Sequence, residues 1–281
     1  MAAHLLKFKS KKVNFLYSVI AILLFAVITY CIIANHLLVI IEENIILSTV
    51  RSYENSDVND SDDDLKNLKY LKNLEHLRLN AVKITNIDFV GEMERLKFLS
   101  VTTSRIENIE AISKCKNLET LYLSGAAITN LNDLEHNTNL KLLCLDWGST
   151  YLSDISALKH LTKLEQLYIS STEITDISVI SELENLTSLK LSNTKVSDVT
   201  QISSCKKLKY LNLYGNESLK DIQPLSALNA LEELILLSTS ISNYEPLLEM
   251  RSLKEVTLPE NQMGLPIAEK LEEKGVSVKF R

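Results

Sequence analysis

Residues 186–191 read Leu-Thr-Ser-Leu-Lys-Leu, and this Leu-x-x-Leu-x-Leu pattern, with an occasional Ile or Val for a Leu, recurs along most of the chain. It begins at Leu74, Leu96, Leu118, Leu140, Leu164, Leu186, Leu208, Leu231 and Leu253. Six of the intervals between successive starts are 22 residues long, and the other two are 23 and 24. So constant a period indicates stacked units, because one such unit is too small to bury its apolar face alone.

A period of 22 residues is typical of leucine-rich repeats and predicts an α/β solenoid with a parallel, concave sheet. The Leu-x-Leu part of each unit, as in Leu189 and Leu191, has the period of a strand and directs both leucines inward. Aliphatic residues ten, thirteen and sixteen positions after the opening Leu, as in Ile174, Ile177 and Ile180, return the chain through the core. A unit this short cannot hold a long helix, so we expect short helical or 3₁₀ turns.

Two cysteines occupy a repeated apolar position three residues before an opening Leu, where Leu or Met otherwise stands. They are Cys115 and Cys205, four repeats apart. A buried free cysteine behaves as a small apolar side chain. Strands spaced by about 4.8 Å would separate the two by roughly 19 Å, which excludes a disulfide between them.

The repeats resemble the short bacterial leucine-rich repeats of the internalin family. Residues 221–225 read Asp-Ile-Gln-Pro-Leu, the turn typical of that family, and residues 175–177 and 197–199 match the first half of it. The position that is usually Asn in that family is usually Thr, Ser or Ala here, as at Thr172 and Thr194, and Asn only at Asn216 and Asn261. The resemblance covers about residues 65–281 and implies a solenoid that binds a partner.

The N-terminal part has the composition of a membrane anchor. Residues 1–12 carry four lysines, and residues 13–41 contain no charged residue, which is long enough for a helix to cross a bilayer. Lysines before the run, with Glu42 and Glu43 after it, predict a cytoplasmic N-terminus and extracytoplasmic repeats. A cleaved signal peptide and a lipoprotein anchored through Cys31 are the alternatives. We expect a polar, acidic linker over 42–64, the solenoid over 65–263, and a capping helix and strand over 264–281.

The composition argues against several classes of function. After residue 12 the chain holds 26 basic and 36 acidic residues, a net charge of −10, which disfavours nucleic acid. The five histidines have no Cys or His at metal-ligand spacing, and the six glycines form no phosphate-binding loop. We therefore expect no metal, no cofactor and no catalytic activity.

The concave face is the candidate site, because residues flanking the inward leucines must face solvent. Two apolar and aromatic clusters are predicted there, with Asp146 beside the first. The central cluster comprises Phe98, Tyr122, Leu142, Cys144 and Tyr168, and the second comprises Tyr210, Tyr214, Ile235 and Leu237. The alternative is that these residues reflect only the strand preference of aromatic and β-branched side chains.

One repeat is two residues longer than the standard unit. The additional length falls in residues 147–151, which contain Trp147, the only tryptophan, and Tyr151. An insertion with aromatic residues beside the concave rim predicts a binding loop. The alternative is that Trp147 folds back over a strand end.

These features predict a single-pass membrane protein that displays a leucine-rich-repeat module outside the cell to bind a protein, or alternatively a glycan, in the manner of an adhesin. The second hypothesis is a regulatory or scaffold subunit that binds an enzyme or envelope complex in the same membrane.

Overall fold

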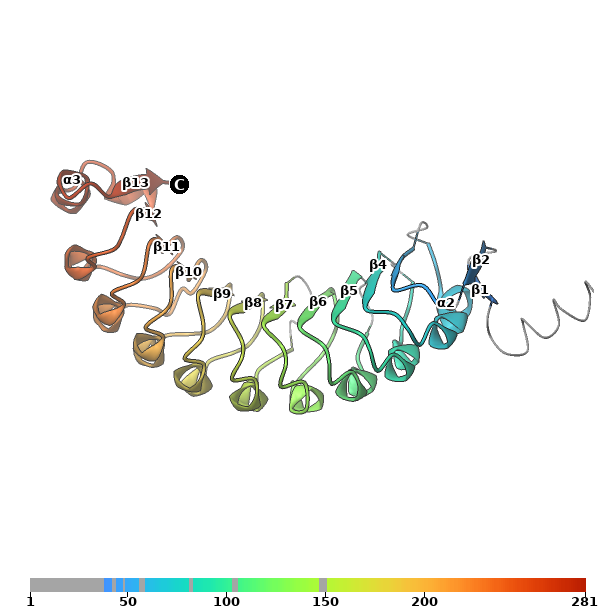
Figure 1. Ribbon diagram of the computed structural model, residues 1–281. Coiled ribbons are helices and arrows are strands. Elements are labelled where there is room, and N and C mark those ends of the chain that lie inside the picture. The colour runs from blue at the N-terminus through green and yellow to red at the C-terminus, as the bar shows by residue number, and fades with distance from the viewer. Residues whose placement is uncertain are drawn as a thin grey trace, which may run out of the picture.

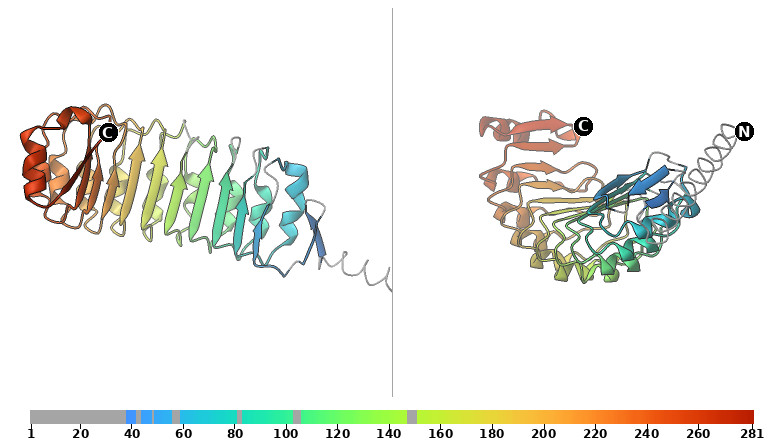
Figure 2. Two further views of the ribbon diagram at one scale, coloured as in Figure 1. Left: turned by 90° about the horizontal axis from the view of Figure 1, so that it is seen from above. Right: turned by 45° about the vertical axis from the view of Figure 1, so that its right-hand side comes forward.

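The computed structural model describes residues 38–41, 44–47, 49–55, 59–80, 83–102, 106–146 and 151–281. Over these residues the chain winds into a curved solenoid with strands along the inner, concave side and short helical turns along the outer side (Figure 1). The strands lie side by side across the curve (Figure 2). The parallel concave sheet expected from the 22-residue period is therefore present.

The concave sheet contains eleven strands among the described residues, and their order along the sheet is their order along the chain. They are β3 (Ser52–Glu54), β4 (His76–Leu79), β5 (Phe98–Thr102), β6 (Thr120–Ser124), β7 (Leu142–Leu145), β8 (Gln166–Ser170), β9 (Ser188–Ser192), β10 (Tyr210–Asn212), β11 (Glu233–Ile235), β12 (Glu255–Leu258) and β13 (Ser277–Phe280). Equivalent positions of successive repeats pair with each other: Leu121 pairs with Leu143, and Leu143 pairs with Leu167.

The leucines of the hexads form the core. Leu121, Leu143, Leu167 and Leu189 are all 0% exposed, as are the opening leucines Leu74 to Leu231. Each buried Leu contributes about 1.5–3 kcal/mol relative to an exposed one. The inward register assigned from the sequence is confirmed, and the residues between the leucines are left on the concave surface.

The outer side consists of short 3₁₀ turns. They are η1 (Lys66–Tyr70), η2 (Asp88–Glu92), η3 (Glu110–Lys114), η4 (Asn132–Leu134), η5 (Ser156–His160), η6 (Ser178–Glu182), η7 (Thr200–Ser204), η8 (Gln223–Ala227), η9 (Glu245–Glu249) and η10 (Glu260–Gln262). Most are preceded by an Asp or Asn whose side chain accepts a hydrogen bond from the N–H two residues later. Asp176 Oδ1, for example, lies 2.8 Å from Ser178 N. This local bond begins the turn.

The cysteines in the repeated core position are buried and make hydrogen bonds to the preceding repeat. Cys115 Sγ lies 3.2 Å from the Val90 carbonyl oxygen, and Cys205 Sγ lies 3.5 Å from that of Ile180. Asn137 occupies the same position between them, and its Nδ2 donates to the Ile112 and Cys115 carbonyls at 2.9 and 3.0 Å. Each of these carbonyls also accepts a backbone N–H from its own repeat, so the side chains add a second hydrogen bond between repeats that Leu or Met cannot make.

The sheet begins earlier than the sequence predicted. Residues 52–54, assigned to the acidic linker 42–64, form β3, which pairs in parallel with β4. Tyr53 lies opposite Leu77 and packs partly buried against the core, so it takes the place of an inward leucine. Helix α2 (Asp62–Leu65) also begins within the expected linker, and it buries Leu65, the first residue of the expected solenoid. The linker prediction is wrong here because the strand carries no Leu-x-Leu pattern.

Most of the predicted membrane span lies outside the described residues. Its last four residues, Leu38–Ile41, form β1, which pairs antiparallel with β2 (Asn44–Leu47). The predicted limit of the helix at residue 41 is therefore wrong, and the Val and Ile residues there favour a strand. Within the described part of the chain, none of the helices has the length and apolar character needed to span a bilayer.

At the other end, helix α3 (Pro266–Glu273) closes the solenoid. It buries Ile267, Ala268 and Leu271. Strand β13 then adds in parallel to β12, with Val278 opposite Val256.

Candidate functional site

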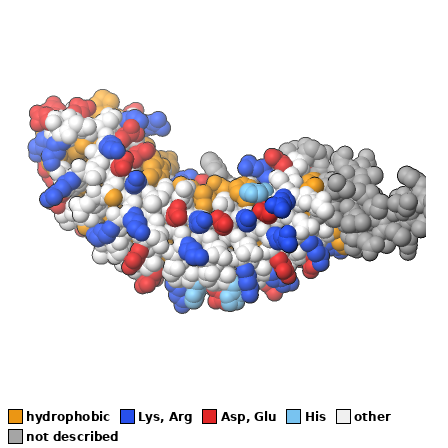
Figure 3. Space-filling model, viewed as in Figure 1, with side chains coloured by type: hydrophobic (Ala, Val, Ile, Leu, Met, Phe, Trp, Pro, Cys, Tyr) orange, Lys and Arg blue, Asp and Glu red, His pale blue; other side chains and the backbone are white. Residues whose placement is uncertain are grey.

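The concave residues line up in rows across the strands. Tyr122 pairs with Cys144 and Cys144 with Tyr168, while Phe98 pairs with Thr120 and Thr120 with Leu142. The structure therefore brings the predicted central cluster together on strands β5 to β8. Figure 3 shows hydrophobic side chains on the inner side of the curve, gathered beside a histidine on the N-terminal limb and again on the C-terminal limb.

Phe98 is the centre of a chain of contacts between rings. Its centroid lies 5.9 Å from that of His76, with an interplanar angle of 28°, and 5.9 Å from that of Tyr122, at 46°. The guanidinium of Arg78 lies 5.5 Å from the centroid of Phe98. Such offset and tilted pairs, and a cation beside a ring, are favourable geometries. The half-buried rings of Phe98 and Tyr122 thus form an ordered surface.

His76 and Arg78 were not assigned to the cluster from the sequence. Both are exposed on β4, beside Phe98 on β5. The signal was present in the repeat period, because His76 and Phe98 share one row and Arg78 and Ser100 share the next. The predicted cluster was defined by hydrophobic side chains, so these two polar residues were left out of it.

Cys144 is the most deeply buried residue of the central cluster. It lies between Tyr122 and Tyr168 in the row and is 7% exposed, so the sequence expectation of a solvent-facing thiol is wrong. Burial raises the pKa of this thiol to about 11, and the charge of Asp146 acts in the same direction. The thiol is therefore protonated at neutral pH and is a poor nucleophile. Tyr122 and Tyr168 flank it in the same row of the sheet.

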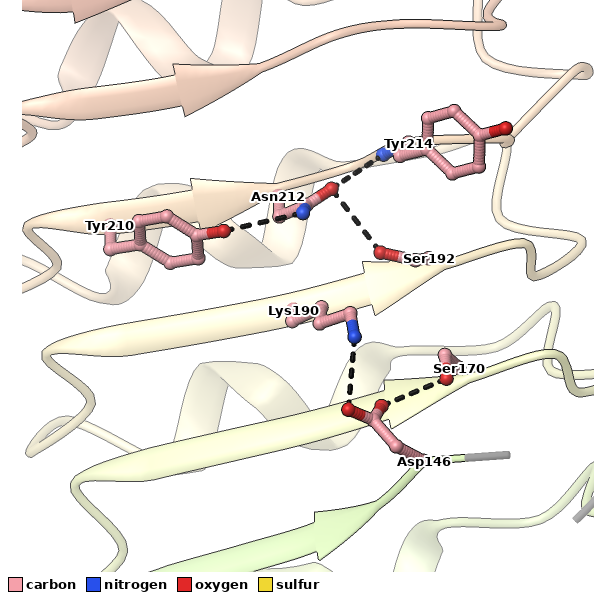
Figure 4. A network of polar contacts seen from close by, with 7 residues as sticks. All are labelled: Asp146, Ser170, Lys190, Ser192, Tyr210, Asn212 and Tyr214. Atoms are coloured by element: carbon pink, nitrogen blue, oxygen red, sulfur yellow. Dashed lines mark hydrogen bonds and ion pairs between the residues drawn. The ribbon is translucent and has the colours of Figure 1, made fainter. Parts of the chain in front are cut away.

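Polar contacts order the surface around Tyr168. Its hydroxyl hydrogen-bonds Gln166 Oε1 at 2.9 Å and Ser188 Oγ at 3.0 Å. Asp146 accepts a hydrogen bond from Ser170 Oγ at 2.8 Å and pairs with Lys190 Nζ at 2.9 Å (Figure 4). The carboxylate of Asp146 is already neutralised by this pair, so it positions neighbouring side chains.

The second cluster surrounds an asparagine. Asn212 Nδ2 donates to the Tyr210 hydroxyl at 3.3 Å, and Asn212 Oδ1 accepts from the Tyr214 N–H at 2.9 Å (Figure 4). Tyr214 is 40% exposed and lines a hollow of about 440 Å³ together with Leu237. Ile235, on β11, is half-buried in the row of Asn212. The second predicted patch therefore exists as a surface on the C-terminal limb.

The predicted binding loop is described only at its end. Trp147 lies outside the described residues, whereas Tyr151 is 69% exposed. The binding role of the loop stays a prediction. Among the described residues, no group of three or more His, Cys, Asp or Glu side chains could hold a metal ion.

Comparison with known proteins agrees with this architecture. A family model described as leucine-rich repeats in two copies matches residues 184–227. No curated protein matches the sequence. Internalin C2 from Listeria monocytogenes has a similar structure, with 22% sequence identity, coverage of 77% of this chain and 85% of that chain, and a TM-score of 0.58.

Two further solved structures are similar. A leucine-rich-repeat protein from Leptospira interrogans is 19% identical over 83% of this chain and 67% of its own, with a TM-score of 0.63. The ectodomain of the plant receptor kinase GASSHO1/SCHENGEN3 from Arabidopsis thaliana, solved with Casparian strip integrity factor 2, is 20% identical over 77% of this chain and 31% of its own, with a TM-score of 0.58. At these identities the likeness shows the fold alone, which is a solenoid of leucine-rich repeats.

Proposed function

We propose that this chain is a membrane-anchored, extracytoplasmic binding module of the adhesin kind, which holds a protein partner on its concave face. The leucine-rich-repeat fold, shared with a receptor ectodomain solved with its partner, supports protein binding as the general role. The anchor and the orientation rest on the sequence. Residues 13–37 contain no charge, and four lysines precede them.

The single observation that carries the proposal is the chain of rings His76, Phe98 and Tyr122 on the concave surface. Aromatic residues held in place by one another lose little conformational freedom on binding, which is why they dominate the energy of protein interfaces. A solenoid core needs only the inward leucines. The outward rings of Phe98 and Tyr122 are half-buried and that of His76 is exposed, so the three rings leave aromatic area uncovered on the concave surface.

The test compares two phenylalanine substitutions in the full chain, purified in mild detergent. Phe98→Ala removes the central ring, and Phe89→Ala makes the same change in a half-buried residue of η2 on the outer side. We expect capture of an external protein ligand to fall about tenfold or more with Phe98→Ala, because interface hot spots contribute about 2 kcal/mol or more. Phe89→Ala should leave capture unchanged, and both variants should keep a cooperative melting transition.

Other outcomes decide between the hypotheses. Equal loss of capture in both variants, or retention in both, would contradict binding on the concave face. Co-purification of a membrane protein, abolished by Phe98→Ala, without capture of any external ligand, would favour the scaffold subunit.

A further inference from the structure

Arg78 lies on the concave face, and among the described residues no carboxylate forms an ion pair with its guanidinium. Other cations of this face are paired, since Lys190 lies 2.9 Å from Asp146 and Lys279 lies 2.6 Å from Glu255. The guanidinium of Arg78 instead lies beside the ring of Phe98. Its N–H groups are exposed to solvent and remain available as donors.

An acid on the neighbouring strand faces Arg78 without forming an ion pair with it. Glu54 is its register partner on β3, but within the described residues the two form no ion pair, and Asn80 Nδ2 contacts Glu54 Oε1 at 3.4 Å. Arg78 leans the other way, toward β5. Because the Glu54 carboxylate repels an incoming anion, the anion is expected to reach the guanidinium of Arg78 on the side next to Phe98.

The surface beside Arg78 is shaped to receive a group of modest size. A hollow of about 270 Å³ is lined by Glu54, His76, Arg78 and Phe98, among others. The ring of Tyr122 lies next to that of Phe98, with 5.9 Å between the two centroids. Burial raises the pKa of the Tyr122 hydroxyl. The positive charge of Arg78 opposes this rise, so its electrostatic effect extends to the Tyr122 ring.

We propose that this end of the concave face recognises an acidic peptide segment in which a carboxylate is followed by an apolar or aromatic side chain. The inference rests on the proposed function and adds the chemistry of the partner. The carboxylate meets the guanidinium of Arg78, which suits two parallel hydrogen bonds. The neighbouring side chain lies against Phe98 and Tyr122, which supply an apolar surface next to the charge.

Arg78 and Phe98 support each other in this arrangement. Stacking against the ring keeps the flexible Arg side chain ordered, so less entropy is lost when its hydrogen bonds form. A basic peptide would face an unpaired guanidinium and is disfavoured. A neutral apolar peptide would cover the rings but would leave the guanidinium partly desolvated without a partner.

The experiment uses two C-terminally amidated peptides, Gly-Asp-Phe-Gly and Gly-Asn-Phe-Gly, each with a fluorescent dye on its N-terminal amine; they differ only in carboxylate against carboxamide. Binding to the full chain in mild detergent is followed by fluorescence anisotropy at low salt. We expect the Asp peptide to bind about tenfold more tightly than the Asn peptide, as a charge-assisted pair at a partly desolvated site requires. In Arg78→Gln the two peptides should bind equally.

Arg95→Gln is the matched control, because Arg95 is exposed in the turn between η2 and β5, outside the strands, and its loss should keep the tenfold preference. Raising the salt concentration should reduce the preference without removing the residual binding of the Asn peptide.

Three results would overturn the inference: no binding of either peptide, equal binding of both by the parent chain, or a preference that survives Arg78→Gln. Binding of an acidic sugar such as N-acetylneuraminic acid, with no binding of the peptides, would also overturn it in favour of a glycan. The proposed function fails separately. If Phe98→Ala abolishes ligand capture while Arg78→Gln changes nothing, the concave face binds its partner and only the acidic specificity is wrong.

Discussion

Lys190 Nζ lies 2.9 Å from Asp146 Oδ2, although 44 positions and one whole strand separate the two residues. Most contacts in a solenoid join neighbouring repeats. This pair instead spans β8 and joins β7 to β9, and Ser170 of β8 donates to the same carboxylate at 2.8 Å. It therefore couples three consecutive repeats on the concave face (Figure 4).

Lys190→Met and Asp146→Asn should each lower the free energy of unfolding by about 1 kcal/mol, since the two side chains are only 27% and 19% exposed. A double-mutant cycle followed by urea unfolding should give a coupling of roughly 0.5–1 kcal/mol. The exposed pair Lys66 and Asp63 is the control and should show almost none. Equal coupling in both cycles would mean that the concave pair has no special role.

The outer turns should make the stability sensitive to acid. Hydrogen bonds from Ser156 N–H and Ser178 N–H lower the pKa of Asp154 and Asp176, and the Thr200 hydroxyl and N–H lower that of Asp198. Because these folded-state pKa values lie below the unfolded value near 3.8, the stabilisation is complete well above pH 3.8 and is lost as the pH falls through the folded-state values.

The measurement for this prediction is urea unfolding at pH 7 and at pH 3. The parent chain should lose more stability on acidification than Asp198→Asn, which keeps an acceptor for the Thr200 N–H but has no proton to gain at residue 198. Identical losses in the two proteins would exclude the turn aspartates as a source of the acid sensitivity.

A glycine in the left-handed backbone region should resist substitution. Gly215 has a φ of +74°, and an added Cβ would clash with Asn193 Oδ1. Gly215→Ala should lower the free energy of unfolding by about 1–2 kcal/mol. Ser171 occupies the equivalent position with a φ of 59° and already carries a Cβ, so Ser171→Ala should change stability by less than about 0.5 kcal/mol. A thermal or urea melt of both variants decides this.

The proposed orientation predicts the labelling of a new cysteine. Cys115, Cys144 and Cys205 are buried, so they should react slowly with a membrane-impermeant maleimide. Glu273→Cys places a thiol at the exposed end of α3. On intact cells this variant should be labelled well above the unsubstituted chain. Labelling only after the cells are lysed would contradict extracytoplasmic repeats.

The repeat period determines what could be predicted from the sequence. It placed every Leu-x-Leu pair inward, and it therefore placed Phe98 and Tyr122 outward, as the structure has them. The repeat period did not predict the strand that lacks the Leu-x-Leu pattern. β3 has Tyr53 instead of leucines, and its role as a strand depends on pairing with β4, which no local pattern encodes.

The rows of the sheet also carry information that a search for apolar clusters overlooks. Contacts of Phe98 with His76 and Arg78 depend on side-chain conformations and not only on register. The same is true of the ion pairs along one rim, where Lys97 lies 2.8 Å from Glu75 and Lys141 lies 2.8 Å from Glu119. Acidic and basic residues alternate in most successive repeats at the position after the opening Leu. The pairing of the strands then places these opposite charges side by side.

The central claim is that a partner rests on the concave rings, and photo-crosslinking in the cells that produce the protein tests it most directly. A benzoylphenylalanine replaces Phe98 in one variant and Phe89, on the outer side, in the other. The account predicts a crosslinked protein adduct from position 98 and none from position 89, with both variants melting cooperatively. An adduct from position 89 alone, or none from position 98 in the folded protein, would contradict it.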